Sequence, residues 1–389
     1  MNTNNTFTLP VVIDQIVPGG LGLGRVDGRV VLVPLAAMGD HCTVTIQLGE
    51  QIGQVDSVET PGPDRVEPAC PHYGECGGCD FMHLSYEGQL QAKVGMIEDA
   101  LRRTAKLQEW PAIAIVASPE PLANRVRATW RPSPDGGAGY FRRDSHEVID
   151  IRTCPILEPT LEARRKVLAP RDVVQALTNG RDVSLAEGDD EAGSIQVTVN
   201  GVRYLARADV FFQANGALLD QFTAFVVEAA APQADQRVHD LYCGLGLFSV
   251  PLARLAGTVD GIDVHEPAIL LGMENARLNA VTNCAFQAMS VENWLRHCPP
   301  AGVTVIDPPR AGLSKATAAL LPGKVRHRLI YVSCDPVTFA RDARRLMDHG
   351  LRLTGLTAFD MFPQTHHVEL VATFEKSARS RRRERASRG

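Results

Sequence analysis

Two hydrophobic patterns divide the chain into regions of different type. Residues 7–60 alternate short β-prone runs, such as VVIDQIV and CTVTIQL, with glycine-rich turns such as PGGLGLG. Four or five strands in so short a span predict a small antiparallel β-barrel. The run TPGPDRVEPAC then breaks the pattern with closely spaced prolines, so we expect the first domain to span residues 1–62.

The second pattern begins near residue 211 and is typical of a parallel sheet. The strand-like runs RVHDLY, TVDGIDV, VTVIDPP and LIYVSCD alternate with helical segments such as FSVPLARLA and PAILLGMENARLNA. This alternation predicts a doubly wound α/β domain over residues 211–375.

The intervening residues 63–210 mix strands, loops and one helix. Apolar residues recur at helical spacing near 86–107, which predicts an amphipathic helix there; they are Leu90, Val94, Ile97 and Leu101. We expect a central α+β domain whose helix packs on the C-terminal domain.

The composition adds that the chain is a water-soluble protein. Its 389 residues suggest two or three domains, with 44% hydrophobic and 22% charged residues. No apolar run is long enough to span a membrane, and no basic residue precedes the first apolar stretch as it would in a secretory signal. We therefore expect a cytoplasmic monomer without a membrane partner.

The formal net charge of −5 argues against a broad surface that coats nucleic acid. Basic residues are nevertheless concentrated in two places. The tail, residues 376–389, holds seven basic residues against one acid and is either a solubilising end or a contact to an RNA backbone. The second set either lines a groove or forms a solvated face: Arg125, Arg127, Arg131, Arg142, Arg143 and Arg152.

The segment VHDLYCGLGLFSVPLARLA predicts a strand, a tight glycine turn and a helix. Gly244 and Gly246 let the backbone approach a ligand closely, and the helix begins with free N–H groups. Asp263 follows at the end of the next strand, where a carboxylate can accept both hydroxyls of a ribose. This layout serves dinucleotides and S-adenosylmethionine alike, although the missing third glycine of GxGxxG weakens the dinucleotide interpretation. A glycine turn without a ligand is the remaining alternative.

Two further strand ends carry candidate chemistry. Asp307 opens the motif DPPR after the strand VTVI, a motif common in methyltransferases that act on planar nitrogen or nucleobases and not needed by nicotinamide enzymes. Cys334 ends the next strand, so both side chains should face the same crevice of a doubly wound sheet. Taken by itself, a strand-end cysteine is more often a small buried hydrophobe than a nucleophile.

Three cysteines, Cys70, Cys76 and Cys79, fall within CPHYGECGGC. An odd total of nine cysteines in a chain without an export signal argues against a disulfide framework. The spacing C-x5-C-x2-C is awkward for zinc without excluding it. With Cys154 as a fourth candidate ligand, the set favours an iron–sulfur site, with ordinary buried cysteines as the alternative.

Four motifs in order, DLYCGLG, DPPRAGL, YVSCDP and FPQTHHVEL, resemble the class I RNA 5-methyluridine methyltransferases. The cysteine spacing resembles the iron–sulfur subgroup of that family, whose known targets are ribosomal RNA. Residues 7–60 resemble the RNA-binding TRAM domain found in front of many members, so the likeness covers nearly the whole chain. It implies a Rossmann-like methyltransferase domain behind a TRAM-like barrel and a central iron–sulfur domain.

The resemblance implies S-adenosylmethionine-dependent formation of 5-methyluridine in 23S ribosomal RNA. It makes Cys334 the nucleophile that adds to uridine C6 and Glu369 the base that removes the C5 proton. Implied contacts to S-adenosylmethionine come from Gln213, Tyr242, Gly244, Asp263 and Asp307. A [4Fe-4S] cluster would be held by Cys70, Cys76, Cys79 and Cys154, with a structural role that ties residues 70–79 to a later strand.

Two positions depart from the family pattern. Leu247 stands where relatives often have an asparagine, which removes one possible cofactor contact. Asp335 replaces the usual asparagine of SCNP and places a carboxylate next to the nucleophile, which would raise the pKa of the thiol if ionised and close.

Other functions remain compatible with parts of the pattern. A transfer-RNA uridine C5 methyltransferase would share the motifs, but that branch generally lacks the cluster cysteines. An iron–sulfur NAD-dependent oxidoreductase would explain the cysteines and the glycine turn while leaving DPPR and SCDP unexplained. A noncatalytic RNA-binding protein that retains the fold is the third alternative.

Overall fold

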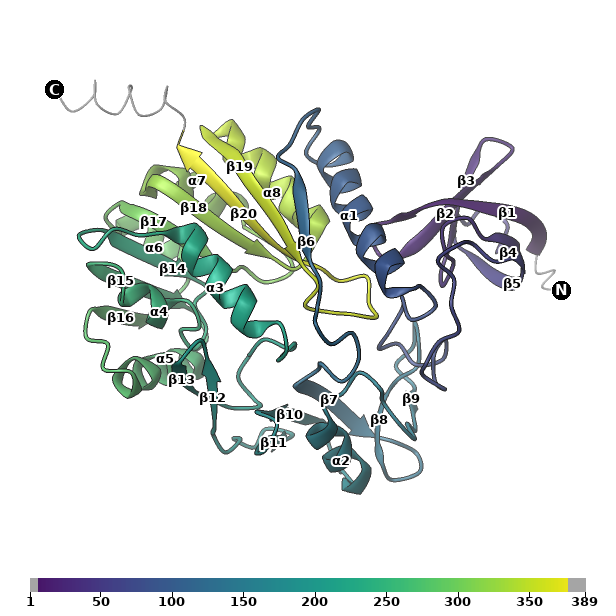
Figure 1. The fold of residues 1–389 in the computed structure, drawn as a ribbon, viewed down its shortest axis with the longest axis horizontal. Helices are drawn as coiled ribbons and strands as arrows, with labels where there is room; N and C mark the ends of the chain where they lie inside the picture. The colour runs from purple at the N-terminus through teal and green to yellow at the C-terminus, as the bar shows by residue number, and fades with distance from the viewer. Residues whose placement is uncertain (1–5, 377–389) are drawn as a thin grey trace.

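The computed structural model describes residues 6–376, so the expected basic tail lies outside the described residues except for its first residue. The N-terminal strands and the largest sheet lie at opposite ends of the molecule, and helix α1 lies between them (Figure 1). The strands form sheets of five, five, two and eight strands. Among residues 6–376, no helix is long and apolar enough to cross a membrane.

The N-terminal sheet consists of five antiparallel strands in the order β3-β2-β1-β4-β5. They are β1 (Thr6–Val17), β2 (Leu21–Val26), β3 (Arg29–Val33), β4 (His41–Gln47) and β5 (Gly53–Thr60). An isolated bridge between Leu32 and Ile52 brings the outer strands β3 and β5 together. Alternate side chains such as Val11, Ile13 and Val44 are buried inside, as the alternating pattern predicts.

The central sheet has the order β11-β10-β7-β8-β9 and carries helix α2 (Pro159–Val167). Its strands are β7 (Arg127–Pro132), β8 (Ala138–Phe141), β9 (Val148–Ile149), β10 (Val174–Thr178) and β11 (Val183–Glu187). Trp130 fills the core and donates a hydrogen bond from Nε1 to the Tyr140 hydroxyl over 3.0 Å. The segment around Cys70 consists of turns, and Cys154 lies in the loop between β9 and α2 rather than on a strand.

The largest sheet has the order β16-β15-β14-β17-β18-β20-β19-β6. Its strands are β6 (Ile113–Val116), β14 (Arg237–Leu241), β15 (Thr258–Asp263), β16 (Cys284–Ala288), β17 (Ala301–Ile306), β18 (Val325–Ser333), β19 (Leu351–Phe359) and β20 (Glu369–Lys376). The five strands from β16 to β18 are parallel, and β20 runs antiparallel to both of its neighbours. The expected Rossmann-like α/β fold is confirmed.

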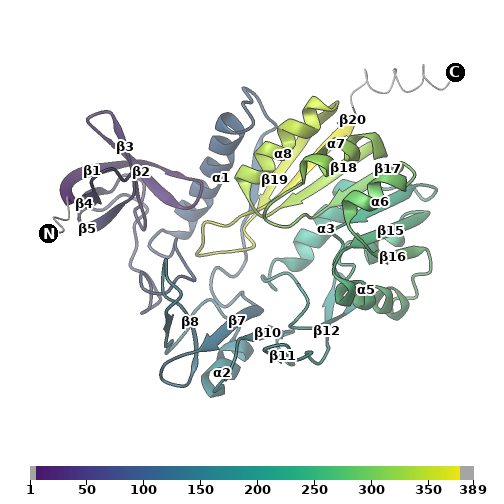
Figure 2. The same ribbon diagram turned by 180° about the vertical axis from the view of Figure 1, so that it is seen from behind.

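Helices cover both faces of this sheet. On one face lie α3 (Leu219–Ala230), α4 (Ser249–Ala253) and α5 (Glu266–Leu278), which share a core that includes Phe222. On the other lie α6 (Val291–His297), α7 (Lys315–Lys324) and α8 (Pro336–Asp348), with Phe339 in their core. Figure 2 shows this second face toward the viewer. The hairpin of β12 (Ile195–Val199) and β13 (Val202–Ala206) joins α5 through Asn275, which accepts a 2.7 Å hydrogen bond from Leu205 N.

Helix α1 (Tyr86–Arg103) connects the barrel to the large domain. It begins at Ser85, whose hydroxyl caps the helix by accepting a hydrogen bond from Gly88 N. Met96 belongs to the barrel core, whereas Ile97 and Leu101 belong to the core of the large sheet. One helix therefore takes part in two hydrophobic cores.

The buried face of α1 differs from the predicted one. Leu90 and Val94 are only partly buried, whereas the polar residues Gln89 and Lys93 are buried. The physical reason is that both polar side chains have partners in the loop between β19 and β20. Lys93 forms a fully buried ion pair with Asp360, and its Nζ also donates to Phe362 O over 3.0 Å.

We predict that the substitution Lys93→Met lowers the free energy of unfolding by about 3–5 kcal/mol, because it leaves the buried Asp360 carboxylate without its counter-charge. Urea denaturation followed by circular dichroism measures this difference. The double variant K93M/D360L, which removes both charges, should recover most of the loss. A loss below about 1 kcal/mol in the single variant would contradict this account of the pair.

Candidate active site

Five predicted site residues gather at one edge of the large sheet. They are Tyr242, Asp263, Asp307, Cys334 and Glu369. The first four stand where the parallel strands β14, β15, β17 and β18 end. Glu369 opens the antiparallel strand β20, whose second residue, Leu370, pairs with Ser333 of β18. The sheet therefore places the nucleophile and base candidates on adjacent strands.

The glycine turn after β14 has backbone that only some residues tolerate. Tyr242, Gly244 and Gly246 have φ values of +64°, +52° and +87°. A Cβ atom added at Gly246 would lie 2.9 Å from the Phe286 ring, whereas one added at Gly244 would meet no atom within 4 Å. Gly246 is thus needed for packing, and the backbone at Gly244 faces open space that a ligand can enter. Tyr242 also has a positive φ, which strains the backbone of a residue with a side chain, and such strained residues are often found at binding sites.

Asp263 is fixed against this turn by backbone hydrogen bonds. Its Oδ2 accepts from Gly244 N over 2.9 Å, and its Oδ1 accepts from His265 N over 2.8 Å. The carboxylate predicted to contact a ribose therefore lies beside the glycine turn, held in one orientation.

Cys334 and Glu369 lie among other carboxyl groups, with Glu369 buried and Cys334 partly buried. Burial, together with the charges of Glu369, Asp307 and Asp335, raises the pKa of the Cys334 thiol to about 12. Burial, with a further contribution from Asp307, raises the pKa of Glu369 well above its usual value. Burial and Asp263 raise the pKa of Asp307 to about 7. In the ligand-free protein at neutral pH, the Cys334 thiol therefore keeps its proton, and the Glu369 carboxyl holds its proton more tightly than an exposed carboxyl does.

Asp240 belongs to the same group, although the sequence analysis did not single it out. It is fully buried in β14, and the pKa of its carboxyl is raised to about 7 by burial, with smaller contributions from Asp307 and Asp263. Its Oδ2 accepts a 2.5 Å hydrogen bond from the Ser249 hydroxyl. The signal was an acid near the end of a predicted strand, just before the glycine turn.

Gln213 lies in the segment between β13 and α3 and is 4% exposed. Two residues earlier, Phe211 is 63% exposed, and the Arg127 guanidinium lies 5.8 Å from the centre of its ring. Phe211 is a second residue that the sequence analysis missed. An exposed aromatic ring backed by a cation offers a flat surface on which a nucleobase can stack.

The two departures from the family pattern have structural explanations. The side chain of Leu247 is buried in the core, and its carbonyl oxygen accepts a 2.9 Å hydrogen bond from Tyr204. Asp335 caps helix α8, since its Oδ1 accepts hydrogen bonds from Val337 N and Thr338 N over 3.0 and 2.8 Å.

The predicted arginine set does not line one groove. Arg131 lies over the Phe141 ring at 3.8 Å, and Arg125 faces the cavity that the cysteines line. Arg142 forms ion pairs with Glu75 and Glu147 at 2.7 and 3.0 Å. A groove between the barrel and the β8–β9 hairpin is nevertheless lined by Arg142 and its neighbour Arg143.

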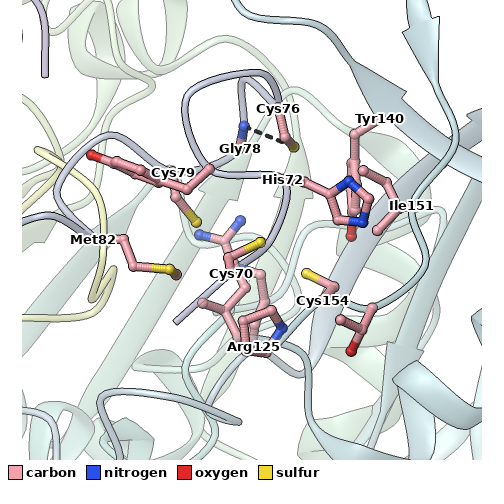
Figure 3. A pocket seen from close by; sticks show the side chains of 14 residues that line it. Cys70, His72, Cys76, Gly78, Cys79, Met82, Arg125, Tyr140, Ile151 and Cys154 are labelled. Carbon is pink, nitrogen blue, oxygen red and sulfur yellow. Dashed lines mark hydrogen bonds between the residues drawn. The ribbon is translucent and has the colours of Figure 1, made fainter. Parts of the chain in front are cut away.

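The four cysteines expected to bind a cluster line one cavity (Figure 3). They are Cys70, Cys76, Cys79 and Cys154. Arg125 and Tyr140 line the same cavity, and Gly78 N donates a 3.4 Å hydrogen bond to Cys76 Sγ. Burial raises the pKa of the Cys154 thiol to about 11 and that of Cys79 further. Within the described chain, no three His, Cys, Asp or Glu side chains already converge as a metal site.

Comparisons with known proteins agree with this geometry. A family model described as tRNA (Uracil-5-)-methyltransferase matches residues 176–298 and 301–377. The 23S rRNA (uracil(1939)-C(5))-methyltransferase RlmD of Shewanella sediminis is 30% identical, over 92% of this chain and 93% of that protein. An RNA methyltransferase of Thermosynechococcus vestitus is also 30% identical, over 95% of this chain and 98% of that protein.

Among solved structures, the tRNA (uracil-54, C5)-methyltransferase of Pyrococcus abyssi, determined with S-adenosyl-L-homocysteine, has the same fold. The TM-score is 0.73 at 24% identity, and the match covers 94% of this chain and all of that one. The sequence matches extend over most of the chain, and the strand ends carry the expected side chains. The protein therefore belongs to the family of RNA uracil-5-methyltransferases.

Proposed function

We propose that the enzyme methylates C5 of a uridine in 23S ribosomal RNA, with Cys334 as nucleophile and Glu369 as base. The observation that carries this proposal is the placement of Cys334, Asp307 and Glu369 on neighbouring strands at one sheet edge, close enough for their charges to interact. The choice of ribosomal RNA is supported by the Shewanella sediminis relative and by the four cysteines around one cavity. Transfer RNA is the alternative substrate, supported by the description of the family model.

The cluster of carboxyl groups at the sheet edge fits a cationic methyl donor. We propose that S-adenosylmethionine is held by Gln213, Tyr242, Gly244, Asp263 and Asp307. When bound, it supplies a methyl group on a positively charged sulfur. Burial, together with neighbouring carboxyl groups, raises the pKa values of Asp307 and Asp240, and a nearby cation would favour their ionised forms.

The chain supplies covalent and acid–base chemistry. Uracil C5 is too electron-poor to accept a methyl group unaided, so the Cys334 thiolate adds to C6 and moves negative charge onto C5 and O4. After C5 is methylated, Glu369 removes the proton from C5. The electron pair of the C5–H bond reforms the C5–C6 double bond, and the bond between sulfur and C6 breaks. The raised pKa makes Glu369 a strong base once it is ionised. Such a transfer typically contributes ~100- to 10,000-fold to the rate.

The cysteine cavity fits a [4Fe-4S] cluster, which we propose is held by Cys70, Cys76, Cys79 and Cys154. Four thiols are the donor set that such a cluster requires, and here all four line one cavity. The cluster would tie the turns of residues 70–79 to the loop that contains Cys154. Because methyl transfer moves no electrons through the protein, we assign the cluster a structural role.

The remaining parts of the chain would bind and present the RNA. We propose the division into a TRAM-like RNA-binding domain (1–62), a central iron–sulfur domain (63–210) and a methyltransferase domain (211–375). The uridine must leave its stack to reach the strand ends, and the exposed ring of Phe211 offers a surface for a displaced base. The groove lined by Arg142 and Arg143 lies between the first two of these units and would follow the RNA backbone.

We predict that Cys334→Ala abolishes the modification. Mass-spectrometric mapping of 23S ribosomal RNA from a deletion strain should show one or more uridines that have lost their methyl group. The wild-type gene should restore this methyl group, and the C334A gene should not. The Cys298→Ala variant, which changes a buried cysteine at the end of α6, should restore the methyl group. If the lost methyl group maps to transfer RNA, the substrate assignment is wrong; if C334A restores it, the nucleophile assignment is wrong.

The ionisation of Cys334 gives a second prediction. In the ligand-free enzyme, alkylation of Cys334 by iodoacetamide should still rise about tenfold per pH unit between about pH 7 and 9, because its pKa is about 12. Asp335→Asn should speed alkylation at every pH, since removing a negative neighbour lowers the pKa of the thiol while asparagine still caps α8. Asp348→Asn, at the other end of α8, is the matched control and should have no effect. A plateau below pH 9 would contradict the prediction.

Metal content tests the cluster. Protein purified without oxygen should contain about four iron atoms and four sulfides per chain. Cys154→Ser should lose most of the iron, whereas Cys298→Ser, with its thiol outside the cavity, should keep it. Zinc in place of iron, or full iron in C154S, would refute the proposed site.

A further inference from the structure

The loop between β19 and β20, residues 360–368, is fixed by a distant segment of the chain. Three of its residues, Asp360, Gln364 and His366, bond to side chains between residues 80 and 93. That segment begins directly after Cys79 and runs into helix α1. The loop ends at Glu369, the first residue of β20. The chain around the cysteines therefore contacts the loop that leads into the proposed base.

Of these three contacts, the one made by Asp80 is nearest to Glu369 in the sequence, because its partner is His366. Its Oδ1 accepts a 2.6 Å hydrogen bond from His366 N, and its Oδ2 lies 2.5 Å from His366 Nδ1. Asp80 thus binds both the backbone and the ring of one residue. In addition, the backbone N–H groups of Asp80 and Phe81 both donate to Gln364 O, over 3.1 and 3.0 Å.

The other two contacts are buried. Gln89 and Gln364 bond reciprocally, since Gln89 Nε2 donates to Gln364 Oε1 over 3.0 Å and Gln364 N donates to Gln89 Oε1 over 2.9 Å. Lys93 pairs with Asp360 at the beginning of the loop. Packing of α1 alone does not require polar residues at positions 89 and 93, because leucine at either position would suit an ordinary buried helix face.

The loop conformation needs this support. Gln364 has φ +68°, a left-handed backbone that costs a residue with a side chain roughly 1–3 kcal/mol. The barrel also closes on the loop, since a Cβ added to Gly20 would lie 2.8 Å from Cβ of His366. Contacts with the surrounding segments therefore help to hold the loop in this conformation.

We propose that Asp80 is a positioning residue for Glu369, acting through His366 on the loop that precedes β20. This inference rests on the proposed role of Glu369 as the base. The affected step is the last one, in which the C5 proton passes to the Glu369 carboxylate and the Cys334 sulfur leaves C6. A catalytic group displaced by about 1 Å can lose about 100-fold in rate. Cys334 itself lies outside this loop, between β18 and α8, so we expect its attack to depend on the loop less than the last step does.

The experiment separates the formation of the covalent adduct from its resolution. Each variant, purified without oxygen, is mixed in single turnover with in vitro transcribed 23S ribosomal RNA and S-adenosylmethionine. Samples quenched in denaturant are resolved by gel to follow the protein–RNA adduct, and released 5-methyluridine is measured in parallel. The variants are Asp80→Asn, His366→Ala and Glu369→Gln. Asp40→Asn is the control, because it weakens a buried carboxylate–arginine pair in the barrel, away from the loop.

We expect D80N and H366A to form the adduct within about threefold of the wild-type rate and to resolve it about 10- to 100-fold more slowly, so that it accumulates. E369Q should accumulate it further. D40N should unfold at lower denaturant and resolve the adduct at the wild-type rate. Iron content is measured for every variant, and H366A, far in sequence from the cysteines, decides the outcome if D80N loses iron.

The outcomes distinguish the role of Glu369 as the base from the positioning role of Asp80. If E369Q does not accumulate adduct, the assignment of the base fails. If E369Q does so while H366A resolves the adduct normally, or slows formation and resolution equally, the positioning role of Asp80 is overturned and the loop contacts serve stability.

Discussion

The active site depends on one constraint of sheet topology, the insertion of antiparallel β20 beside parallel β18. Parallel strands bring their carboxyl ends to the same edge, which accounts for Tyr242, Asp263, Asp307 and Cys334. An antiparallel strand brings its amino end to that edge, and Glu369 is the first residue of β20. The proposed nucleophile and the proposed base thus come from neighbouring strands that run in opposite directions, and backbone hydrogen bonds between these strands hold the two residues near one another.

The same geometry concentrates negative charge. Burial, together with nearby carboxyl groups, raises the pKa values of Asp240, Asp307, Glu369 and the Cys334 thiol, so these groups hold their protons more tightly in the ligand-free site than they would in water. A positively charged ligand changes that balance, since it favours the ionised form of every nearby acid. A bound cation would therefore favour ionisation of the Cys334 thiol and of the Glu369 carboxyl.

Local patterns in the sequence predicted the features that depend on local physics. The strands of the large domain, the glycine turn at Gly244 and the acid at Asp263 follow from short-range periodicity and spacing. Gln89 and Lys93 were missed because their burial depends on partners more than 260 residues away in the sequence. The partial burial of Leu90 and Val94 has the same cause. Phe211 was missed because an exposed aromatic ring looks in the sequence like one more core residue.

Helix α1 contributes Met96 to the barrel core and Ile97 to the core of the large sheet, so the two ends of the molecule share a structural element. The barrel is therefore joined to the large sheet by a packed helix and not by a flexible linker. If the barrel binds RNA as proposed, this shared helix sets the distance from the barrel to the strand ends around Cys334, and a bound RNA would have to present its uridine at that distance. Substrate selection would then begin with the shape of the RNA, before any base is recognised.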